Sequence, residues 1–189
     1  SYTYTADQTA ADALDVNDSV TDTFVYTLSD GTATDTANLV ITVTGVNDTP
    51  TAQNDVGFID EGETLTVTNG ANANVSGSYD EEHSGDLIDT SSSSHQDSDP
   101  DASPTLRISA IQPSGGSSSS VSSGSSYNSS GTSVTGTYGT LTIGADGSYT
   151  YAANDSISGF DANETLTDTF TYTLSDEHDA TDTATLTIT

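Results

Sequence analysis

The chain contains no cysteine and no lysine, and Arg107 is the single arginine among its 189 residues. The lack of cysteine excludes disulfides, thiolate chemistry and cysteine-ligated zinc. One arginine cannot neutralise a row of phosphates, so nucleic acid and anionic membrane surfaces are excluded as partners. No apolar run approaches the roughly 20 residues of a membrane-spanning helix, so we expect no membrane insertion.

Acidic residues dominate the charge. The 29 aspartates and glutamates give a formal net charge of −28. Leu, Ile, Val and Phe make up about 17% of the chain, and a chain below roughly 20% with a large net charge leans towards disorder. Any folded state of such a polyanion must therefore find cations to reduce its self-repulsion.

Apolar residues nevertheless recur with a period of two, often with threonine between them. This alternation predicts strands with one buried and one exposed face, and a turn at residues 145–147 that joins two of them. It also predicts that six tyrosines lie on buried faces: Tyr2, Tyr4, Tyr26, Tyr149, Tyr151 and Tyr172. Since no segment has a helical period, we expect an all-β sandwich. The alternating stretches are 23–29, 38–44, 65–67, 106–110, 141–143, 149–151, 170–174 and 186–188.

The chain also repeats itself. Residues 21–30 recur at 167–176, an offset of 146, and residues 1–4 recur at 148–151, an offset of 147. A fixed long period indicates a tandem array of domains. We therefore expect residues 1–45 to be the C-terminal strands of an incomplete repeat, 46–50 to be a linker, and 51–189 to be a nearly complete repeat with Ser-rich loop insertions, among them the stretches 91–94 and 113–133. On this interpretation the chain is a window of a longer polypeptide.

Two runs of the second repeat, residues 136–151 and 164–176, resemble the VCBS repeat of giant RTX-type bacterial surface adhesins. Residues 46–50 resemble the linker between cadherin domains, and residues 97–101 resemble the acidic loop between early strands. The resemblance implies tandem Greek-key sandwiches of the cadherin- or immunoglobulin-like class, seven strands in each. It further implies calcium at the domain junctions, export by a type I system and a role in adhesion.

Calcium is also suggested by the residues themselves. Asp97, Asp99 and Asp101 alternate in one loop, so their side chains can converge, and calcium takes six to eight hard oxygen ligands. An EF-hand is excluded because Ala102 and Ile108 stand where that loop needs glycine and a carboxylate. Equally, these residues could be solvated loop acids, as aspartates beside Gly and Ser usually are.

The resemblance implies a junction site and the residues that form it. Its ligands would be Asn47, Asp48, Asp97, Asp99, Asp101 and Asp176. The preceding domain would add Asp15 or Asp18, and Glu61 is a weaker candidate.

We expect no enzyme, because no nucleophile motif is present and acids are too abundant to nominate a pair. The expected function is a calcium-stiffened structural repeat of an extracellular adhesin stalk or surface filament, in cell adhesion, biofilm or matrix attachment. Its partners would be neighbouring repeats, or copies of itself in a fibre. Two alternatives stay open: a glycan-binding module using Tyr79, Tyr127 and Tyr138, and a halophilic acidic spacer without specific calcium sites.

Overall fold

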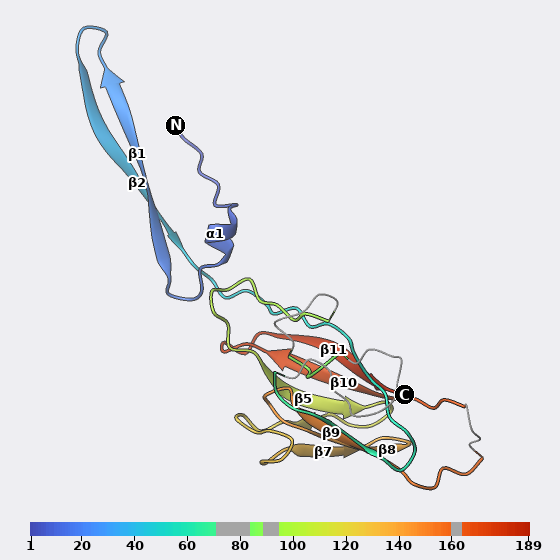
Figure 1. Cartoon of the computed structure of the whole chain (residues 1–189). Helices are drawn as coiled ribbons and strands as arrows, with labels where there is room; N and C mark the ends of the chain where they lie inside the picture. The colour runs from blue at the N-terminus through green and yellow to red at the C-terminus, as the bar shows by residue number, and fades with distance from the viewer. Residues whose placement is uncertain (71–83, 89–94, 160–163) are drawn as a thin grey trace. The chain divides into compact units, whose positions relative to one another are not determined.

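The computed structural model describes residues 1–70, 84–88, 95–159 and 164–189. The chain separates into two compact units (Figure 1). The N-terminal unit contains Ser1–Asp48 and Pro100–Ser103, and the C-terminal unit contains Thr49–Asp99 and Pro104–Thr189. The Ser-rich stretch 91–94 and Tyr79 lie outside the described residues.

The N-terminal unit is built on a long antiparallel hairpin. Strands β1 (Ser19–Ser29) and β2 (Thr34–Thr44) pair along their whole length, and a four-residue helix, α1 (Thr9–Asp12), precedes them. The turn is closed by Asp30, whose Oδ1 accepts hydrogen bonds from the backbone N–H groups of Thr32 and Ala33, both at 2.8 Å. These bonds hold the pKa of the Asp30 carboxyl below its ordinary value.

The prediction that the N-terminal tyrosines are buried is wrong for Tyr2 and Tyr26, which are 70% and 51% exposed. Tyr4 is half-buried: its ring packs edge-on against Phe24, and its hydroxyl donates to Asp22 at 2.6 Å. The reason is that the described part of this unit contains one two-stranded sheet. Alternation selects the apolar face of a strand, but a second layer is needed to bury that face.

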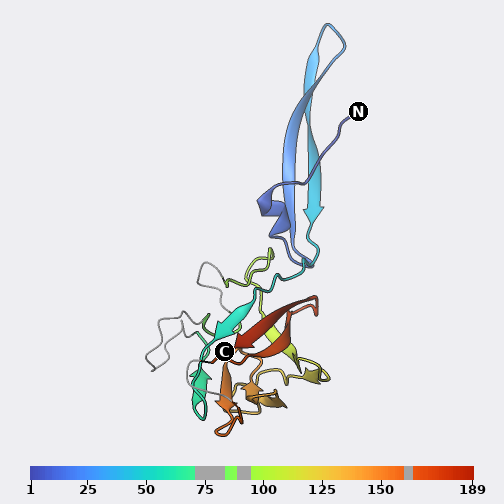
Figure 2. The same cartoon turned by 90° about the vertical axis from the view of Figure 1, so that its right-hand side faces the viewer.

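The C-terminal unit is a sandwich of two sheets (Figures 1 and 2). All neighbouring strands are antiparallel except β3 and β11, which run parallel. The chain crosses between the sheets four times, from β3 to β4, from β4 to β5, from β6 to β7 and from β9 to β10, as in Greek-key sandwiches. The five-stranded sheet has the order β3 (Asp55–Gly57), β11 (Thr181–Ile188), β10 (Asp168–Ser175), β5 (Arg107–Pro113) and β6 (Ser119–Ser120); the four-stranded sheet has the order β4 (Thr64–Val67), β9 (Tyr149–Ala153), β8 (Gly139–Ile143) and β7 (Thr132–Thr135).

The core lies between these two sheets and uses the alternating residues. Every buried hydrophobic residue of the described chain belongs to this unit. The all-β sandwich prediction is confirmed, and so is the turn at 145–147, which joins β8 to β9. Concentrating few apolar residues in one core is how this composition supports a fold. The large buried side chains are Leu65, Leu87, Ile108, Ile111, Leu141, Ile143, Tyr149, Tyr151, Phe170, Tyr172, Leu174, Leu186 and Ile188.

The C-terminal unit contains nine strands among its described residues, rather than the seven that the resemblance implies. The alternation missed β3, β6 and β7, which are two to four residues long. The prediction that 113–133 is a loop is wrong at β6, because Ser119 and Ser120 pair with Ile111 and Ala110. A serine pair carries no hydrophobic period, so only its backbone hydrogen bonds define this strand.

A buried carboxylate joins the two sheets. Asp168, at the start of β10, accepts hydrogen bonds from the N–H groups of Thr137 and Tyr138 at 2.8 and 2.9 Å, and from the Tyr151 hydroxyl at 2.7 Å. Gly136 is so close that a Cβ there would stand 2.2 Å from Asp168 Oδ2. The loop between β7 and β8 is therefore shaped around this one side chain.

Candidate metal centre

In the C-terminal unit, three segments meet where β11 begins. The backbones of Thr51 and Ser98 exchange hydrogen bonds of 2.7 and 3.1 Å. The next two residues are held by carboxylates: Asp182 Oδ2 accepts from Ala52 N–H at 2.9 Å, and Asp97 Oδ1 accepts from Gln53 N–H at 2.8 Å. Asp97 is thus placed beside the edge of the five-stranded sheet.

Asp97 is 2% exposed, and Asp99 is partly buried two residues later. The buried position of Asp97 has an electrostatic consequence for Tyr172 in β10. Burial raises the pKa of Tyr172, and the nearby charges of Asp55 and Asp97 raise it further. An ionised carboxylate at such depth is stable only when it is paired, hydrogen-bonded or bound to a cation.

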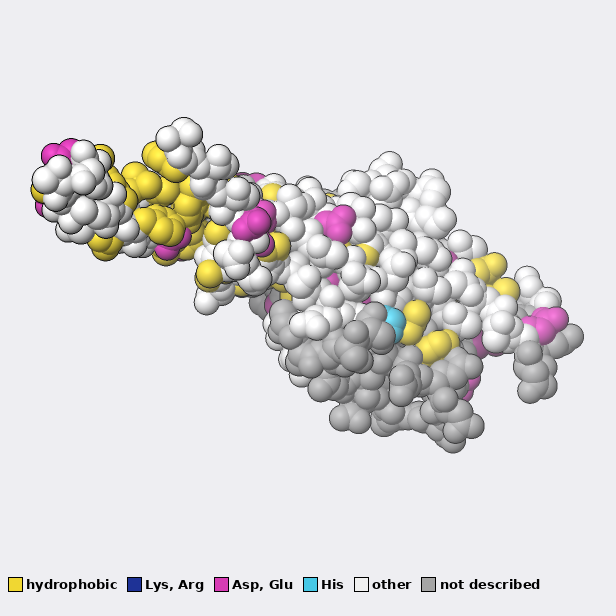
Figure 3. Space-filling view, turned by 90° about the horizontal axis from the view of Figure 1, so that it is seen from above, with side chains coloured by type: hydrophobic (Ala, Val, Ile, Leu, Met, Phe, Trp, Pro, Cys, Tyr) yellow, Lys and Arg dark blue, Asp and Glu magenta, His cyan; other side chains and the backbone are white. Residues whose placement is uncertain are grey.

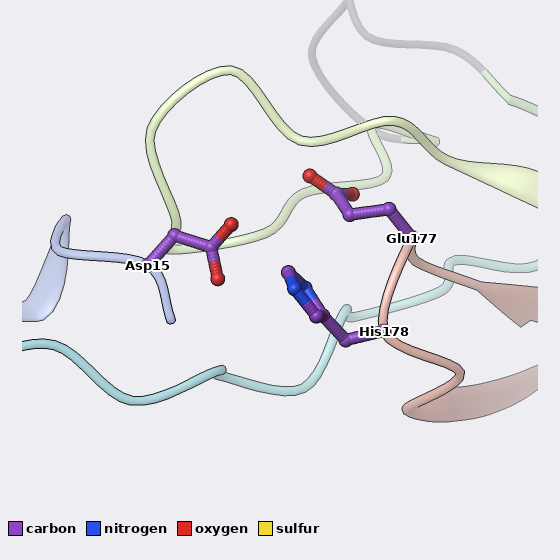
Figure 4. A group of neighbouring side chains, drawn as sticks. All are labelled: Asp15, Glu177 and His178. Carbon is purple, nitrogen blue, oxygen red and sulfur yellow. The ribbon is translucent and has the colours of Figure 1, made fainter. Parts of the chain in front are cut away.

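The turn between β10 and β11 supplies a second buried acid at the same end of the sheet. Asp176 is 1% exposed, and its Oδ1 accepts hydrogen bonds from the N–H groups of His178 and Ala180, both at 2.9 Å. Glu177 and His178 lie side by side on this turn (Figure 4), and Glu177 Oε2 accepts from Thr105 N–H at 2.7 Å. The turn therefore buries the Asp176 side chain and leaves those of Glu177 and His178 exposed.

The only ion pair of the described chain also forms here, between Arg107 and the largely exposed Asp179 at 2.5 Å. Because Arg107 is the sole lysine or arginine of the whole sequence, no such side chain is left to balance Asp97 or Asp176. The remaining sources of positive charge are histidine, the amino terminus and ions in solution.

In the N-terminal unit, the candidate ligands lie around its last residues. Asp101 is buried, and its Oδ2 accepts from the N–H group of Asp48 at 2.9 Å. The Asn47 side-chain amide donates to the Asp48 carbonyl at 2.5 Å. The structure therefore brings Asn47, Asp48 and Asp101 together.

The loop between α1 and β1 carries Asp15 and Asp18. Asp15, drawn in Figure 4, accepts at Oδ1 from Val16 N–H at 2.5 Å. The Asp18 carbonyl accepts from Gly45 N–H at 3.0 Å, and a Cβ on Gly45 would stand 2.2 Å from the Leu14 carbonyl oxygen. This loop therefore packs tightly against the residues just before Asn47.

The structure does not bring Glu61 to this end of the sandwich. Glu61 Oε1 accepts from Ile157 N–H at 2.7 Å, and Ile59 N–H donates to the Thr189 carbonyl beyond the end of β11. Asp97 and Asp176 lie where β11 begins. The length of that strand separates Glu61 from them.

The alternative of a glycan-binding module needs exposed tyrosine rings. Tyr127 and Tyr138 are both partly buried. In addition, the backbone of Tyr138 is fixed by its hydrogen bond to Asp168.

Three buried carboxylates escaped the sequence analysis: Asp55, Asp86 and Asp168, which are 2%, 4% and 5% exposed. Their local sequences resemble those of exposed aspartates, so no local signal marks them. Asp168 alone had a possible sequence signal, because it lies in the repeated motif 167–176. That signal does not predict burial, since the counterpart of Asp168 in the first copy, Asp22, is exposed.

These donor sets fit one kind of ligand. Carboxylate, amide and backbone oxygens are hard ligands, which suit calcium or magnesium far better than softer metals. The nearby hydrogen bonds orient the carboxylates, as outer partners do in metal sites. Asn47, Asp48 and Asp101, which lie together, could hold an ion in the N-terminal unit, whereas Asp97 and Asp176 lie at the same end of the five-stranded sheet in the C-terminal unit.

The chain matches a model of a known protein family. The model of the family described as bacterial cadherin-like domain matches residues 47–189. A search of the curated proteins found no match. Among the described residues, no helix is long and apolar enough to cross a membrane.

Proposed function

Because the chain belongs to the bacterial cadherin-like domain family, we propose that it is a calcium-stiffened structural repeat of an extracellular adhesin stalk or surface filament. Domains of this family are typically extracellular and non-enzymatic. We also propose that the repeat acts in adhesion, that it is related to VCBS repeats and that a type I system exports it.

One observation carries the calcium part of the proposal. Asp97 and Asp176 are 2% and 1% exposed, in a protein with 29 acidic residues and one arginine that is already paired with Asp179. Removing a charge from water is unfavourable unless an opposite charge or strong hydrogen bonds replace the solvent. Calcium supplies that charge and binds extracellular modules at about 0.1–1 mM, a concentration found outside cells.

The repeat part rests on the N-terminal hairpin. Its register equals that of β10 and β11: Phe24 faces Leu39 as Phe170 faces Leu186, and Tyr26 faces Ala37 as Tyr172 faces Ala184. Phe24 and Tyr26 are about half exposed, and yellow side chains gather on this unit in Figure 3. Phe170 and Tyr172 are fully buried. This identity of register supports an array of like domains.

Thermal unfolding of the full chain, followed by circular dichroism at fixed ionic strength, tests the calcium part. Calcium at a hundred times its dissociation constant adds about 2.7 kcal/mol, a rise in Tm of roughly 5–10 °C for a domain of this size. We expect this rise with calcium and a smaller one with magnesium. Asp97→Asn and Asp176→Asn should reduce it, while Asp155→Asn, an exposed control, should keep it. If sodium chloride alone gives the same rise, the acidity is an adaptation to salt and the proposal fails.

Stiffening needs its own measurement. Because the chain lacks cysteine, Thr32→Cys and Ser156→Cys, both exposed, accept one spin label each. We expect a narrow label-to-label distance distribution in calcium and a broad one after chelation. Equal widths in both conditions would remove stiffening from the proposed function while leaving calcium binding intact.

A further inference from the structure

A buried carboxylate oxygen on the inner face of β3 lacks a hydrogen-bond partner. Asp55 and Gly57 are the two inward residues of this strand. Asp55 Oδ2 accepts from the Tyr172 hydroxyl at 2.7 Å, whereas Oδ1 has no hydrogen-bond partner in the described part of the chain. Asp55 is 2% exposed. A buried acceptor left in this state costs about 1–3 kcal/mol, and more when it is charged.

A second buried polar group without a hydrogen-bond partner in the described residues, the hydroxyl of Tyr149, approaches β3 from the opposite sheet. Tyr149 in β9 is fully buried, and its hydroxyl also has no hydrogen-bond partner among the described residues. That hydroxyl oxygen lies 3.3 Å from the position that a Cβ on Gly57 would take, so it reaches β3 beside Asp55. Buried tyrosine hydroxyls usually find a partner, which makes this one informative.

Asp86 brings a second negative charge to this place. Its segment is held on both sheets: Ser84 exchanges hydrogen bonds with the backbone of Val56 in β3, and Leu87 N–H donates to the Gly147 carbonyl before β9. Asp86 is 4% exposed, and its Oδ2 accepts from Gly70 N–H at 2.8 Å. Burial raises the pKa of Tyr149, and the charges of Asp55 and Asp86 raise it further.

We propose that Asp55, Asp86 and Tyr149 form an inner site for a hard divalent cation, between the two sheets of the C-terminal unit. Two carboxylates supply a charge of −2, which one calcium ion balances. Oδ1 of Asp55 and the Tyr149 hydroxyl are hard oxygens without hydrogen bonds, which is what ligation needs. Backbone carbonyls and water complete such coordination shells.

The nearby titratable groups offer at most one positive charge to balance the two carboxylates. Arg107 pairs with Asp179, and Tyr172 already donates to Asp55. Among the described residues, His95 is the histidine whose charge favours the ionised form of Asp55, and its Nδ1 hydrogen-bonds the Asn54 carbonyl at 2.5 Å. The inner site shares no residue with the acids of the proposed function, so the two stand or fall separately.

Calcium stoichiometry of the full chain, measured by isothermal titration calorimetry and equilibrium dialysis, tests the inner site. Asp55→Asn should bind one calcium ion fewer than the unchanged chain. Its melting temperature in chelator should be higher, because a neutral amide removes the buried charge. Asp155→Asn, an exposed control, should keep both values. Asp97→Asn should keep the inner ion, which separates this result from a failure of the proposed function.

Tyr149→Phe provides a second readout that preserves the core packing. We expect calcium affinity at one site to fall about tenfold or more, with near-ultraviolet circular dichroism in chelator showing a folded protein. Tyr127→Phe serves as the matched control. If Tyr149→Phe and Asp86→Asn are folded and bind as many calcium ions, as tightly, as the unchanged chain, Asp55 and Tyr149 bind only water or a proton and the proposal is overturned. Tyr149→Phe and Asp86→Asn therefore test the inner site even if Asp55→Asn does not fold.

Discussion

The hydroxyl of Tyr151 in β9 donates a hydrogen bond of 2.7 Å to Asp168 Oδ2 at the start of β10, and so links the two sheets of the sandwich. The same carboxylate binds two backbone N–H groups of the loop between β7 and β8. The Asp168 side chain therefore holds β10, the facing strand β9 and the loop between β7 and β8 in position.

We expect Tyr151→Phe to destabilise the C-terminal unit by about 1.5–3 kcal/mol, because it removes one hydrogen bond to a charged group. Asp168→Ala should cost more, since it leaves the Tyr151 hydroxyl and the N–H groups of Thr137 and Tyr138 without their acceptor. Urea unfolding in calcium measures both, and the double variant gives their coupling. Tyr127→Phe should change stability by less than about 0.5 kcal/mol. Additive effects of the two substitutions would show that the hydrogen bond contributes nothing.

Gly136 should tolerate no side chain, for steric reasons. A Cβ there would stand 2.2 Å from Asp168 Oδ2 and 3.0 Å from the ring of Phe170. The carboxylate cannot swing aside without breaking its three hydrogen bonds, so we expect Gly136→Ala to destabilise by about 2–4 kcal/mol. Gly115→Ala is the comparison: its φ is +72° but nothing lies within 4 Å, so only backbone strain of about 1 kcal/mol is expected. Urea unfolding measures both, and equal losses would contradict the steric explanation.

The alternating pattern predicted most of the C-terminal sandwich, because a period of two records which residues face the core of a sheet. It failed for Tyr26 and succeeded for Tyr172, although both occupy the same position of one motif. The local sequence pattern around the two tyrosines is the same. They differ because a second sheet covers Tyr172 and none covers Tyr26 in the described structure. It also could not find Asp55, whose burial depends on contact with Tyr172, 117 residues away. In a chain with so many aspartates, only the three-dimensional contacts distinguish a buried acid from a solvated one.

The location of the core predicts how fragments will behave. All buried hydrophobic residues lie in the C-terminal unit, whereas the hairpin exposes Val25, Leu28 and Val40. A two-stranded hairpin alone is at best marginally stable in water. We therefore expect residues 49–189 to unfold cooperatively in chelator, within a few degrees of the full chain, and residues 1–48 to show no cooperative transition. Differential scanning calorimetry measures this. A cooperative transition for residues 1–48 would mean that the hairpin finds its own second layer, for instance in a second copy.

Asp55 should make stability depend on pH when calcium is chelated. Burial raises its pKa to about 6, opposed by the hydrogen bond from Tyr172, by the nearby Ser84 hydroxyl and by the charge of His95; the charge of Asp86 adds to the rise. The pKa in the unfolded chain is near 3.9. Since the folded state prefers the protonated acid, this contribution is fully present below about pH 4 and is lost as the pH rises through 6. The loss is about 3 kcal/mol.

Asp55→Asn isolates this contribution from those of the other carboxylates. An amide does not titrate, so the stability of the variant should exceed that of the unchanged chain at pH 8 and approach it at pH 4. Chemical unfolding at constant ionic strength, in chelator, across pH 4–8 gives the difference directly. Calcium should suppress that difference, because a bound cation favours the ionised carboxylate and so reverses the preference of the folded state. A difference that is constant with pH would mean that Asp55 keeps an ordinary pKa, and its burial would then be balanced by hydrogen bonds alone.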